Sequence, residues 1–222
     1  MDNKLELITA LLERIRSSDE HISSRAFYEL DKTGLLQDGS LRGSSFKGAI
    51  LSLQSFHRVN LREIDFSESE LWEADFRFSN LMGCLFCKAQ MRAVVFEESI
   101  LEYAMFDDSD LRYARIGNDL RFTSFARANL EHALIDGDLR NSSMRYANLQ
   151  NASIDDCNLC GANFHNANLR DATLSGSAFD RTTILPDGTA WSFETDLMRF
   201  TDATDIQFWR SHDPLSPAFI SE

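Results

Sequence analysis

The sequence predicts an all-β solenoid, a parallel β-helix with four walls, about seven and a half coils and a different structure at each end. Three observations predict it. An apolar residue recurs at every fifth position, the same residue class returns at every twentieth position, and the position two residues before each apolar residue is mostly small. Neither an α-helix, with period 3.6, nor a β-strand, with period 2, keeps one face at a spacing of five.

The five-residue period begins at Leu41 and continues without a break for 16 positions. Its members are Leu41, Phe46, Leu51, Phe56, Leu61, Phe66, Leu71, Phe76, Leu81, Phe86, Met91, Phe96, Leu101, Phe106, Leu111 and Ile116. A short fixed period of this kind indicates units that bury their apolar residues only by stacking on their neighbours.

A second period, four times as long, lies above the first. Phe46, Phe66, Phe86 and Phe106 are every fourth member of the series, and so are Leu41, Leu61, Leu81 and Leu101. Four apolar positions per turn predict a four-sided coil in which side chains one full turn apart form ladders. If successive coils pair as parallel strands do, each coil rises about 4.8 Å. Phenylalanine and leucine ladders are then expected on alternating walls.

Two shortened steps interrupt the period. The step from Ile116 to Leu120 loses one residue, and so does the step from Ile135 to Leu139. Both fall at the same corner of the coil, and Gly117 and Gly137 lie in them, as expected for tight turns. The period then continues to Ile184, where we place the last inward residue.

The position two residues before each apolar residue is mostly Ala or Ser. Four segments read Ala128-Asn129-Leu130, Ala147-Asn148-Leu149, Ala162-Asn163-Phe164 and Ala167-Asn168-Leu169. This pattern resembles the pentapeptide-repeat proteins, whose consensus is A-(D/N)-(L/F)-x-x, over roughly residues 39–185. The resemblance implies a right-handed quadrilateral β-helix for residues 39–185 and says little about function.

The ends of the chain lack the period and are predicted to cover the terminal coils, because a bare coil exposes apolar rings and a strand edge. Residues 1–38 are predicted to form an N-terminal helical cap. Its two amphipathic helices span 3–17 and then about 19–30, with Asp19 as N-cap and Gly34 after the second helix. Leu5 and Ile22 are placed on the apolar sides of these helices.

Residues 186–222 are predicted to form a C-terminal cap and tail. The exit segment Ile184-Leu185-Pro186-Asp187-Gly188-Thr189 resembles the one that ends many pentapeptide-repeat chains. Beyond it lies an apolar cluster without period five, which we expect to fold onto the shaft or to pair two chains. Its members are Trp191, Phe193, Leu197, Met198, Phe200, Ile206, Phe208 and Trp209.

Composition excludes several partner classes. The 222 residues carry a formal net charge of −13, which disfavours binding to a nucleic-acid backbone or an anionic membrane surface. No stretch is long and apolar enough to span a bilayer, and the first residues lack a secretory apolar region. We therefore expect a cytoplasmic protein without membrane contact, without direct nucleic-acid binding and without a cofactor.

Four cysteines form two C-x-x-C pairs, Cys84 with Cys87 and Cys157 with Cys160. Such pairs are typical of zinc sites. In the five-residue frame, however, Cys84 and Cys157 point inward while Cys87 and Cys160 point outward. The two members of each pair then lie on opposite sides of the coil wall. We therefore expect small apolar thiols and no metal site.

No catalytic arrangement is predicted either. His57, His132 and His165 all fall at outward positions, and no histidine adjoins a serine or cysteine nucleophile. Paired carboxylates such as Glu97 and Glu98 lie on a convex wall, where we expect no cleft. The chain is therefore predicted not to be an enzyme.

The outward position before each apolar residue is usually Asn, Asp or Ser, and this rule fails in the third and fourth coils. Exposed apolar residues gathered in one patch usually indicate an interface. The candidate interaction patch consists of Leu85, Val95, Ile100 and Met105, with Trp72 and Phe78 one coil earlier. We expect Leu85 and Met105, one full turn apart, to stack on one wall, with Ile100 and Val95 around nearby corners.

Three functions are compatible with these features. The first is a non-catalytic protein-interaction or scaffold module that presents a rigid rod to an unidentified protein. The second follows from the resemblance, since some pentapeptide-repeat proteins imitate duplex DNA and bind type II topoisomerases such as gyrase. Its candidate acidic surface is Glu97, Glu98, Glu102, Asp107, Asp108 and Asp110, although arginines interrupt it. The third is a structural spacer or oligomerising rod, including a homodimer formed through a terminal cap.

Overall fold

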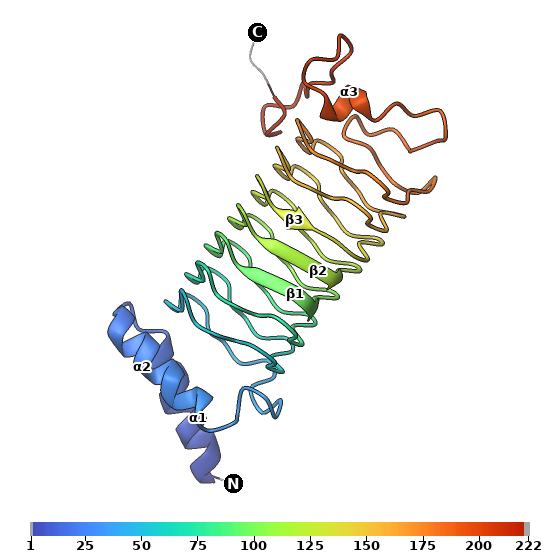
Figure 1. The fold of residues 1–222 in the computed structure, drawn as a ribbon. Coiled ribbons are helices and arrows are strands. Elements are labelled where there is room, and N and C mark those ends of the chain that lie inside the picture. The colour runs from blue at the N-terminus through green and yellow to red at the C-terminus, as the bar shows by residue number, and fades with distance from the viewer. Residues whose placement is uncertain (1, 220–222) are drawn as a thin grey trace.

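The computed structural model describes residues 2–219 and shows a straight shaft with a helix pair at one end and a short helix at the other (Figure 1). The helices are α1 (Asp2–Ile15), α2 (Glu20–Asp31) and α3 (Met198–Thr201), and the longer strands are β1 (Val95–Ile100), β2 (Arg115–Asp119) and β3 (Leu134–Ile135). These three strands form one parallel sheet in the order β1-β2-β3. The parallel β-helix predicted from the sequence is therefore confirmed.

Successive coils are joined by parallel bridges between positions 20 apart, 19 apart in the shortened coils and 21 apart between Asn163 and Ile184. Ser45 pairs with Asp65 and Asp65 with Leu85, for example, while Met105 pairs with Ser124. Most inward residues of the shaft donate their backbone N–H to a carbonyl of the next coil, as in the 2.7 Å bond from Phe46 to Asp65. The walls are named here by their inward residues. Wall 1 begins with Leu41, wall 2 with Phe46, wall 3 with Leu51 and wall 4 with Phe56.

The core of the shaft is a double ladder of phenyl rings. On wall 2, Phe66 and Phe86 stack with ring centroids 5.1 Å apart and planes 2° apart, and Phe106 follows at 4.9 Å. Wall 4 carries a second ladder, in which Phe56 and Phe76 stack at 4.3 Å. The two ladders meet edge to face across the axis, with centroids 5.5–5.9 Å apart. The predicted stacking of Phe46, Phe66, Phe86 and Phe106 is confirmed.

The corners of the coil place bulky residues in the left-handed backbone region. Glu63, Tyr103 and Arg127, each two residues after an inward residue, have φ values of 60°, 62° and 60°. This region is uncommon for residues with a Cβ, and it fits the third residue of a type II turn. The turn is closed by a backbone bond such as that from Ala49 N–H to Phe46 O, 3.0 Å. The cross-coil bonds of the neighbouring walls hold this conformation in place.

In the first two coils, the turn at the corner after wall 4 is closed by a side chain of the next coil. The Ser79 hydroxyl donates to the carbonyl of Phe56, 2.6 Å away, and accepts from the N–H of Val59 at 3.1 Å. Ser99 repeats this arrangement with the carbonyl of Phe76. The small inward residue therefore does more than fit a narrow space, because its hydroxyl satisfies two buried backbone groups.

The two shortened coils lack the small inward residue at this corner. Gly137 has φ +97°, and a Cβ there would meet the backbone of Asn118, so only glycine fits. Gly117 does not have a positive φ, and Asn118 takes the left-handed conformation instead, at 91°. A Cβ at Gly117 would meet only the carboxylate of Asp136. The prediction of tight glycine turns is thus right for Gly137 and wrong for Gly117.

The last inward residue is Leu185, so the placement of Ile184 at that position is wrong. Ile184 pairs with Asn163, which precedes the inward Phe164, and Leu185 is 3% exposed. One extra residue is inserted between Phe179 and Leu185, and the five-residue count shifts by one. Thr183 takes the small inward position and donates its hydroxyl to Leu159 O at 2.9 Å.

Helices α1 and α2 pack on the first coil at the N-terminal end of the shaft. Asp19 caps α2 by accepting from His21 N–H at 2.9 Å, and Phe27 lies on the Phe56 ring with centroids 4.6 Å apart. The buried Ser23 donates to Ile15 O and Ile50 O, joining both helices to the coil. Two residues expected on the apolar sides, Leu5 and Ile22, are exposed, since only one edge of each helix faces the coil.

The C-terminal segment folds back onto its own shaft. Phe200 is buried and the Trp191 ring stacks on Phe179 with centroids 5.8 Å apart. Residues 211–219 then run back to the shaft, where Ser211 and Ser216 both donate to Asn166, at 2.9 and 2.7 Å. Within one chain, therefore, Trp191, Phe200 and Trp209 pack on the shaft, whereas Phe193, Met198 and Ile206 of the apolar cluster are exposed.

We expect Ser79→Ala to lower the free energy of unfolding by about 1–3 kcal/mol, because it leaves a buried N–H and a carbonyl without a partner. Ser69→Ala is the matched control. Its hydroxyl donates to Phe66 O, and the Ser69 N–H already bonds that carbonyl. Urea-unfolding midpoints followed by circular dichroism should therefore fall clearly further for Ser79→Ala. Equal shifts would contradict the bridging role.

Candidate interaction surface

The outer surface of the shaft consists of columns of side chains, three columns per wall. In each repeat the residue before the inward position and the two after it point outward, and equivalent residues of successive coils lie one above another. A residue's surface neighbours are therefore found 19 or 20 positions away in the sequence. Residues five apart lie on adjacent walls, around a corner.

Of the predicted patch, the structure brings together Leu85 and Met105. They pair directly on wall 2, where the same column otherwise holds polar residues such as Asp65 and Ser124, apart from Ile184 in the last coil. Met105 is 40% exposed, and Leu85 is half-buried beside it. This two-residue apolar strip is called the wall-2 pair below.

The other four residues are distributed over the remaining walls. Val95 lies on wall 4 between Asp75 and Arg115, and Ile100 lies on wall 1 between Asn80 and Asp119. Trp72 follows the inward Leu71 of wall 3, and Phe78 lies at the corner after wall 4. The six residues therefore do not form one patch, because neighbours in the sequence are turned to different walls.

The six candidate acidic residues are also spread over all four walls. Glu97 and Glu98 lie on wall 4, Glu102 on wall 1, Asp107 and Asp108 on wall 2, and Asp110 on wall 3. Five of them have an arginine within ion-pair distance, and only Glu98 has none among residues 4–219. The pairs are Glu97–Arg115, Glu102–Arg121, Asp107–Arg127, Asp108–Arg127 and Asp110–Arg112.

One short motif produces several of these ion pairs. In the sequence Asp-apolar-Arg, the aspartate precedes the inward residue and the arginine follows it, so both point outward on one wall. Arg77 binds Asp75 through two hydrogen bonds, of 2.9 and 2.6 Å, and Arg140 binds Asp138 in the same way. Hydrogen bonds from these arginines hold the pKa values of Asp75 and Asp138 below their ordinary range.

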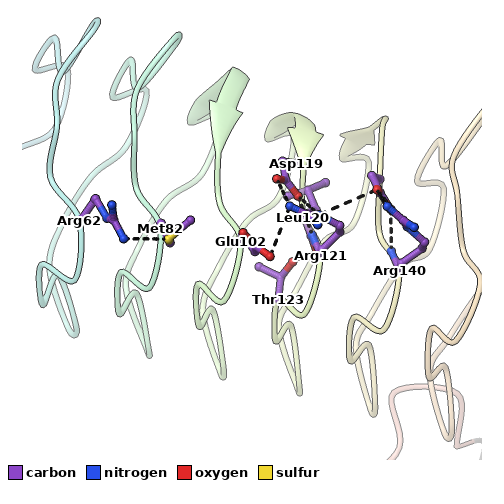
Figure 2. A network of polar contacts seen from close by, with 9 residues as sticks. Arg62, Met82, Glu102, Asp119, Leu120, Arg121, Thr123 and Arg140 are labelled. Atoms are coloured by element: carbon purple, nitrogen blue, oxygen red, sulfur yellow. Dashed lines mark hydrogen bonds and ion pairs between the residues drawn. The ribbon is translucent and has the colours of Figure 1, made fainter.

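On wall 1 the motif extends into a ladder that crosses three coils (Figure 2). Arg121 lies 2.8 Å from Asp119, 3.3 Å from Glu102 and 4.0 Å from Asp138, which in turn binds Arg140 at 2.7 Å. In the sequence these arginines stand out only as interruptions of the negative surface. The signal that could have revealed the ladder is the repetition of Asp-Leu-Arg at residues 119–121 and 138–140.

Shallow depressions occur on this surface, contrary to the expectation of an uninterrupted convex wall. One of about 360 Å³ lies at the corner of walls 4 and 1, where the shortened coils recede, and it is bordered by Glu97, Glu98 and Asp136. Another, of about 310 Å³, lies at the corner of walls 3 and 4 beside Trp72 and Tyr113.

The two C-x-x-C pairs are split by the wall, as the repeat frame predicts. Cys84 and Cys157 are buried, whereas Cys87 and Cys160 are half-exposed. Desolvation raises the pKa of both buried thiols to about 12. The members of a pair therefore do not converge on one point.

Within residues 4–219 no group of three or more His, Cys, Asp or Glu side chains could hold a metal ion. None of the helices described is long and apolar enough to cross a membrane. The arrangement of the surface thus offers regular columns of apolar, aromatic and ion-paired side chains to a binding partner.

Comparison with known proteins relates the chain to one repeat family. A sequence model of pentapeptide repeats, with eight copies, matches residues 55–86, 117–159 and 147–183. No curated protein gave a match. Similar solved structures include HetL, a pentapeptide-repeat protein involved in heterocyst differentiation regulation from the cyanobacterium Nostoc sp. strain PCC 7120. HetL is 18% identical, with 75% of this chain and 98% of HetL covered and a TM-score of 0.40.

Two further solved structures are similar at comparable identity. QnrB1, a plasmid-mediated fluoroquinolone resistance protein, is 18% identical over 60% of this chain and 70% of QnrB1, with a TM-score of 0.48. Rfr23, a pentapeptide-repeat protein from the cyanobacterium Cyanothece 51142, is 18% identical over 70% of this chain and 97% of Rfr23, with a TM-score of 0.30.

The wall-1 ladder predicts a pH-dependent contribution to stability. Because the folded pKa of Asp138 is depressed, its contribution is present above the unfolded value of about 3.9 and is lost as the pH falls through the folded pKa. Asp138→Asn should lower the free energy of unfolding at pH 7 by about 0.5–1 kcal/mol. The difference from the unmodified protein should shrink as the pH falls below the unfolded value and disappear once Asp138 is protonated in the folded state as well.

Asp156→Asn is the control, because among residues 4–219 no ion pair involves Asp156. Urea-unfolding midpoints measured from pH 7 to pH 2 for the three proteins check this. A difference for Asp138→Asn that persists at the lowest pH would mean that the carboxylate's charge is not the cause.

Proposed function

We propose that the protein is a non-catalytic interaction module that presents a rigid rod surface to another protein. The chain belongs to the pentapeptide-repeat family. Pentapeptide-repeat proteins are generally non-enzymatic structural or interaction modules. In this proposal residues 1–38 and 186–222 are caps that close the two ends of the shaft. The binding surface then lies on the walls between them.

The observation that carries the proposal is the wall-2 pair. Leu85 and Met105 replace polar residues in a column that holds Ser45, Asp65 and Ser124 in other coils. The cross-coil backbone bonds hold this pair in place, including that from Met105 N–H to Cys84 O at 2.9 Å. The rod is therefore already ordered at this pair, and binding of a partner there would cost little conformational entropy of the rod.

Imitation of DNA for a type II topoisomerase is the alternative, and the charge arrangement makes it the weaker one. A DNA mimic needs rows of uncompensated carboxylates facing a basic groove. Here five of the six candidate acidic residues lie beside arginines, at 2.5–3.9 Å, and the six are spread around the rod. Such neutralised pairs contribute little long-range attraction.

A spacer or self-associating rod is the third possibility, and exposed side chains at the C-terminal end support it. Phe193 is 89% exposed, Ile206 99% and Leu215 83%, whereas Phe200 and Trp209 pack on the shaft. A homodimer formed through this end would bury them. Size-exclusion chromatography with light scattering separates this role from a monomeric module.

Met105→Glu should abolish capture of the native protein partner, because it places a charge in the apolar strip. Leu134→Glu is the matched control, since Leu134 is 48% exposed at the equivalent position on wall 4. The measurement is an affinity pull-down from the native cell extract with the three proteins, followed by mass spectrometry. Loss of the same partner with both variants, or with neither, would argue against the wall-2 pair as the contact.

The protein is expected to leave the supercoiling activity of DNA gyrase unchanged at low and at physiological salt. A carboxylate mimic would inhibit or protect the enzyme more strongly at low salt, where Coulomb attraction is less screened. Supercoiling assays with and without a quinolone check this. An effect that weakens with salt and is lost in Glu98→Gln would favour the alternative.

A further inference from the structure

We infer that the depression at the corner of walls 3 and 4 binds an arginine side chain from a basic segment of a partner protein. This inference rests on the interaction role proposed above and names the chemistry of one partner group. The depression, called the Trp72 slot below, has a volume of about 310 Å³ and is lined by Trp72, Glu73, Arg92, Ala93 and Tyr113. It lies on a different face from the wall-2 pair.

The slot exists because one position in a column of outward side chains is occupied by an alanine. The second residues after the inward positions of wall 3 include Glu73, Ala93 and Tyr113, all in the left-handed conformation with φ of 54°, 58° and 61°. Elsewhere in this column neighbours stack closely, since Tyr113 and His132 lie with ring centroids 5.0 Å apart and planes 12° apart. Ala93 offers only a methyl group, so a space is left between Glu73 and the Arg92 guanidinium, which itself lies against Tyr113.

The size of the slot suits one flat group. Glu73 and Tyr113 are two coils apart, which is roughly 10 Å at the spacing of parallel strands. A planar group in contact with a neighbour on each side requires about 7–8 Å. The Arg92 guanidinium already lies over Tyr113, so the space that remains beside Trp72 and Glu73 takes one flat group, a guanidinium or an aromatic ring, whereas an α-helix does not fit.

The carboxylates beside Trp72 favour a guanidinium over an uncharged ring, and Arg92 is the like charge in the lining that opposes it. Trp72 lies between Glu70 and Glu73 in the sequence, and among residues 4–219 neither carboxylate takes part in an ion pair. The indole is 51% exposed, and an indole face is the aromatic surface that attracts a cation most strongly. The chain as a whole carries a net charge of −13, which steers basic partners toward it.

The same surface already shows this contact within the chain. The Arg92 guanidinium lies 5.1 Å from the centroid of Tyr113, and Arg58 lies 5.6 Å from that of Phe78. In both cases the arginine comes from the coil before the aromatic residue. At the corresponding positions, 21 and 20 residues before Trp72, stand the inward Leu51 and Ser52, so that coil gives Trp72 no cation. In the proposed complex, an arginine of the partner provides this cation for Trp72.

The test uses two blocked peptides, Ac-Gly-Arg-Gly-Arg-Gly-NH₂ and its lysine counterpart, titrated into the isotope-labelled protein. The readout is the Trp72 indole N–H resonance, assigned by its loss in Trp72→Ala. We expect the arginine peptide to shift this resonance with a dissociation constant in the millimolar range, about −4 kcal/mol, and the lysine peptide to bind several-fold more weakly. Glu73→Gln should weaken the arginine peptide by about threefold.

Ala93→Tyr should abolish binding, because the new side chain fills the slot while Tyr113 shows that tyrosine is tolerated at an equivalent corner. Trp72→Ala should weaken binding about three- to fivefold, measured on the remaining shifted amides. Arg92→Gln should strengthen it, since a like charge is removed from the slot. Tyr103→Ala, an exposed aromatic on wall 1, is the control and should leave binding unchanged.

Equal binding of the two peptides that Trp72→Ala does not change would mean that only net charge attracts them, and would overturn the assignment. So would the absence of any Trp72 shift at saturating peptide. These outcomes leave the interaction role intact if Met105→Glu still loses the native partner. If Met105→Glu keeps the native partner while the Trp72 resonance still responds to the arginine peptide, the arginine slot stands and the proposed wall-2 contact is wrong.

Discussion

The structure depends on one steric constraint, the convergence of four walls on a narrow axis. Each wall has room for one large inward side chain per coil, and the position two residues earlier must be small. The phenyl rings of walls 2 and 4 fill the space by stacking along the axis at 4.3–5.1 Å and meeting edge to face across it. Because all the other residues must then point outward, the core dictates both the sequence period and the columns of the surface.

The same constraint explains how the coil corners tolerate unfavourable backbone conformations. Residues as bulky as Tyr103 and Phe122 adopt positive φ, which costs an isolated residue about 1–3 kcal/mol. Each corner is held by cross-coil hydrogen bonds on both sides, such as Tyr103 N–H to Arg121 O at 3.1 Å. Stacked side chains then recover part of the cost, since the Tyr103 and Phe122 rings lie 5.1 Å apart.

The fold was predictable from the sequence because the inward residues are periodic, whereas the surface was not. Stacking of Phe46 on Phe66 follows from counting alone. The extra residue before Leu185 was missed because Ile184 is apolar and fits the count equally well, and only the pairing with Asn163 distinguishes them. The six-residue patch was predicted from outward positions around nearby corners, although Val95 and Met105 belong to opposite walls. The ion pairs of Arg121 with Glu102 and Asp138 cross to neighbouring coils and have no signal within one repeat.

A surface built from columns carries its information in positions 19 or 20 apart, and it responds to the size of single side chains. Leu85 and Met105 differ from their column neighbours in polarity, and Ala93 differs from its neighbours in size. Both departures leave the inward residues unchanged, because the cross-coil backbone bonds fix the coil whatever the outward side chain is. A rod of this kind can therefore change its binding surface one column position at a time while its core stays constant. For that reason the positions that break a column's pattern, rather than the repeat consensus, are where a specific partner would be recognised.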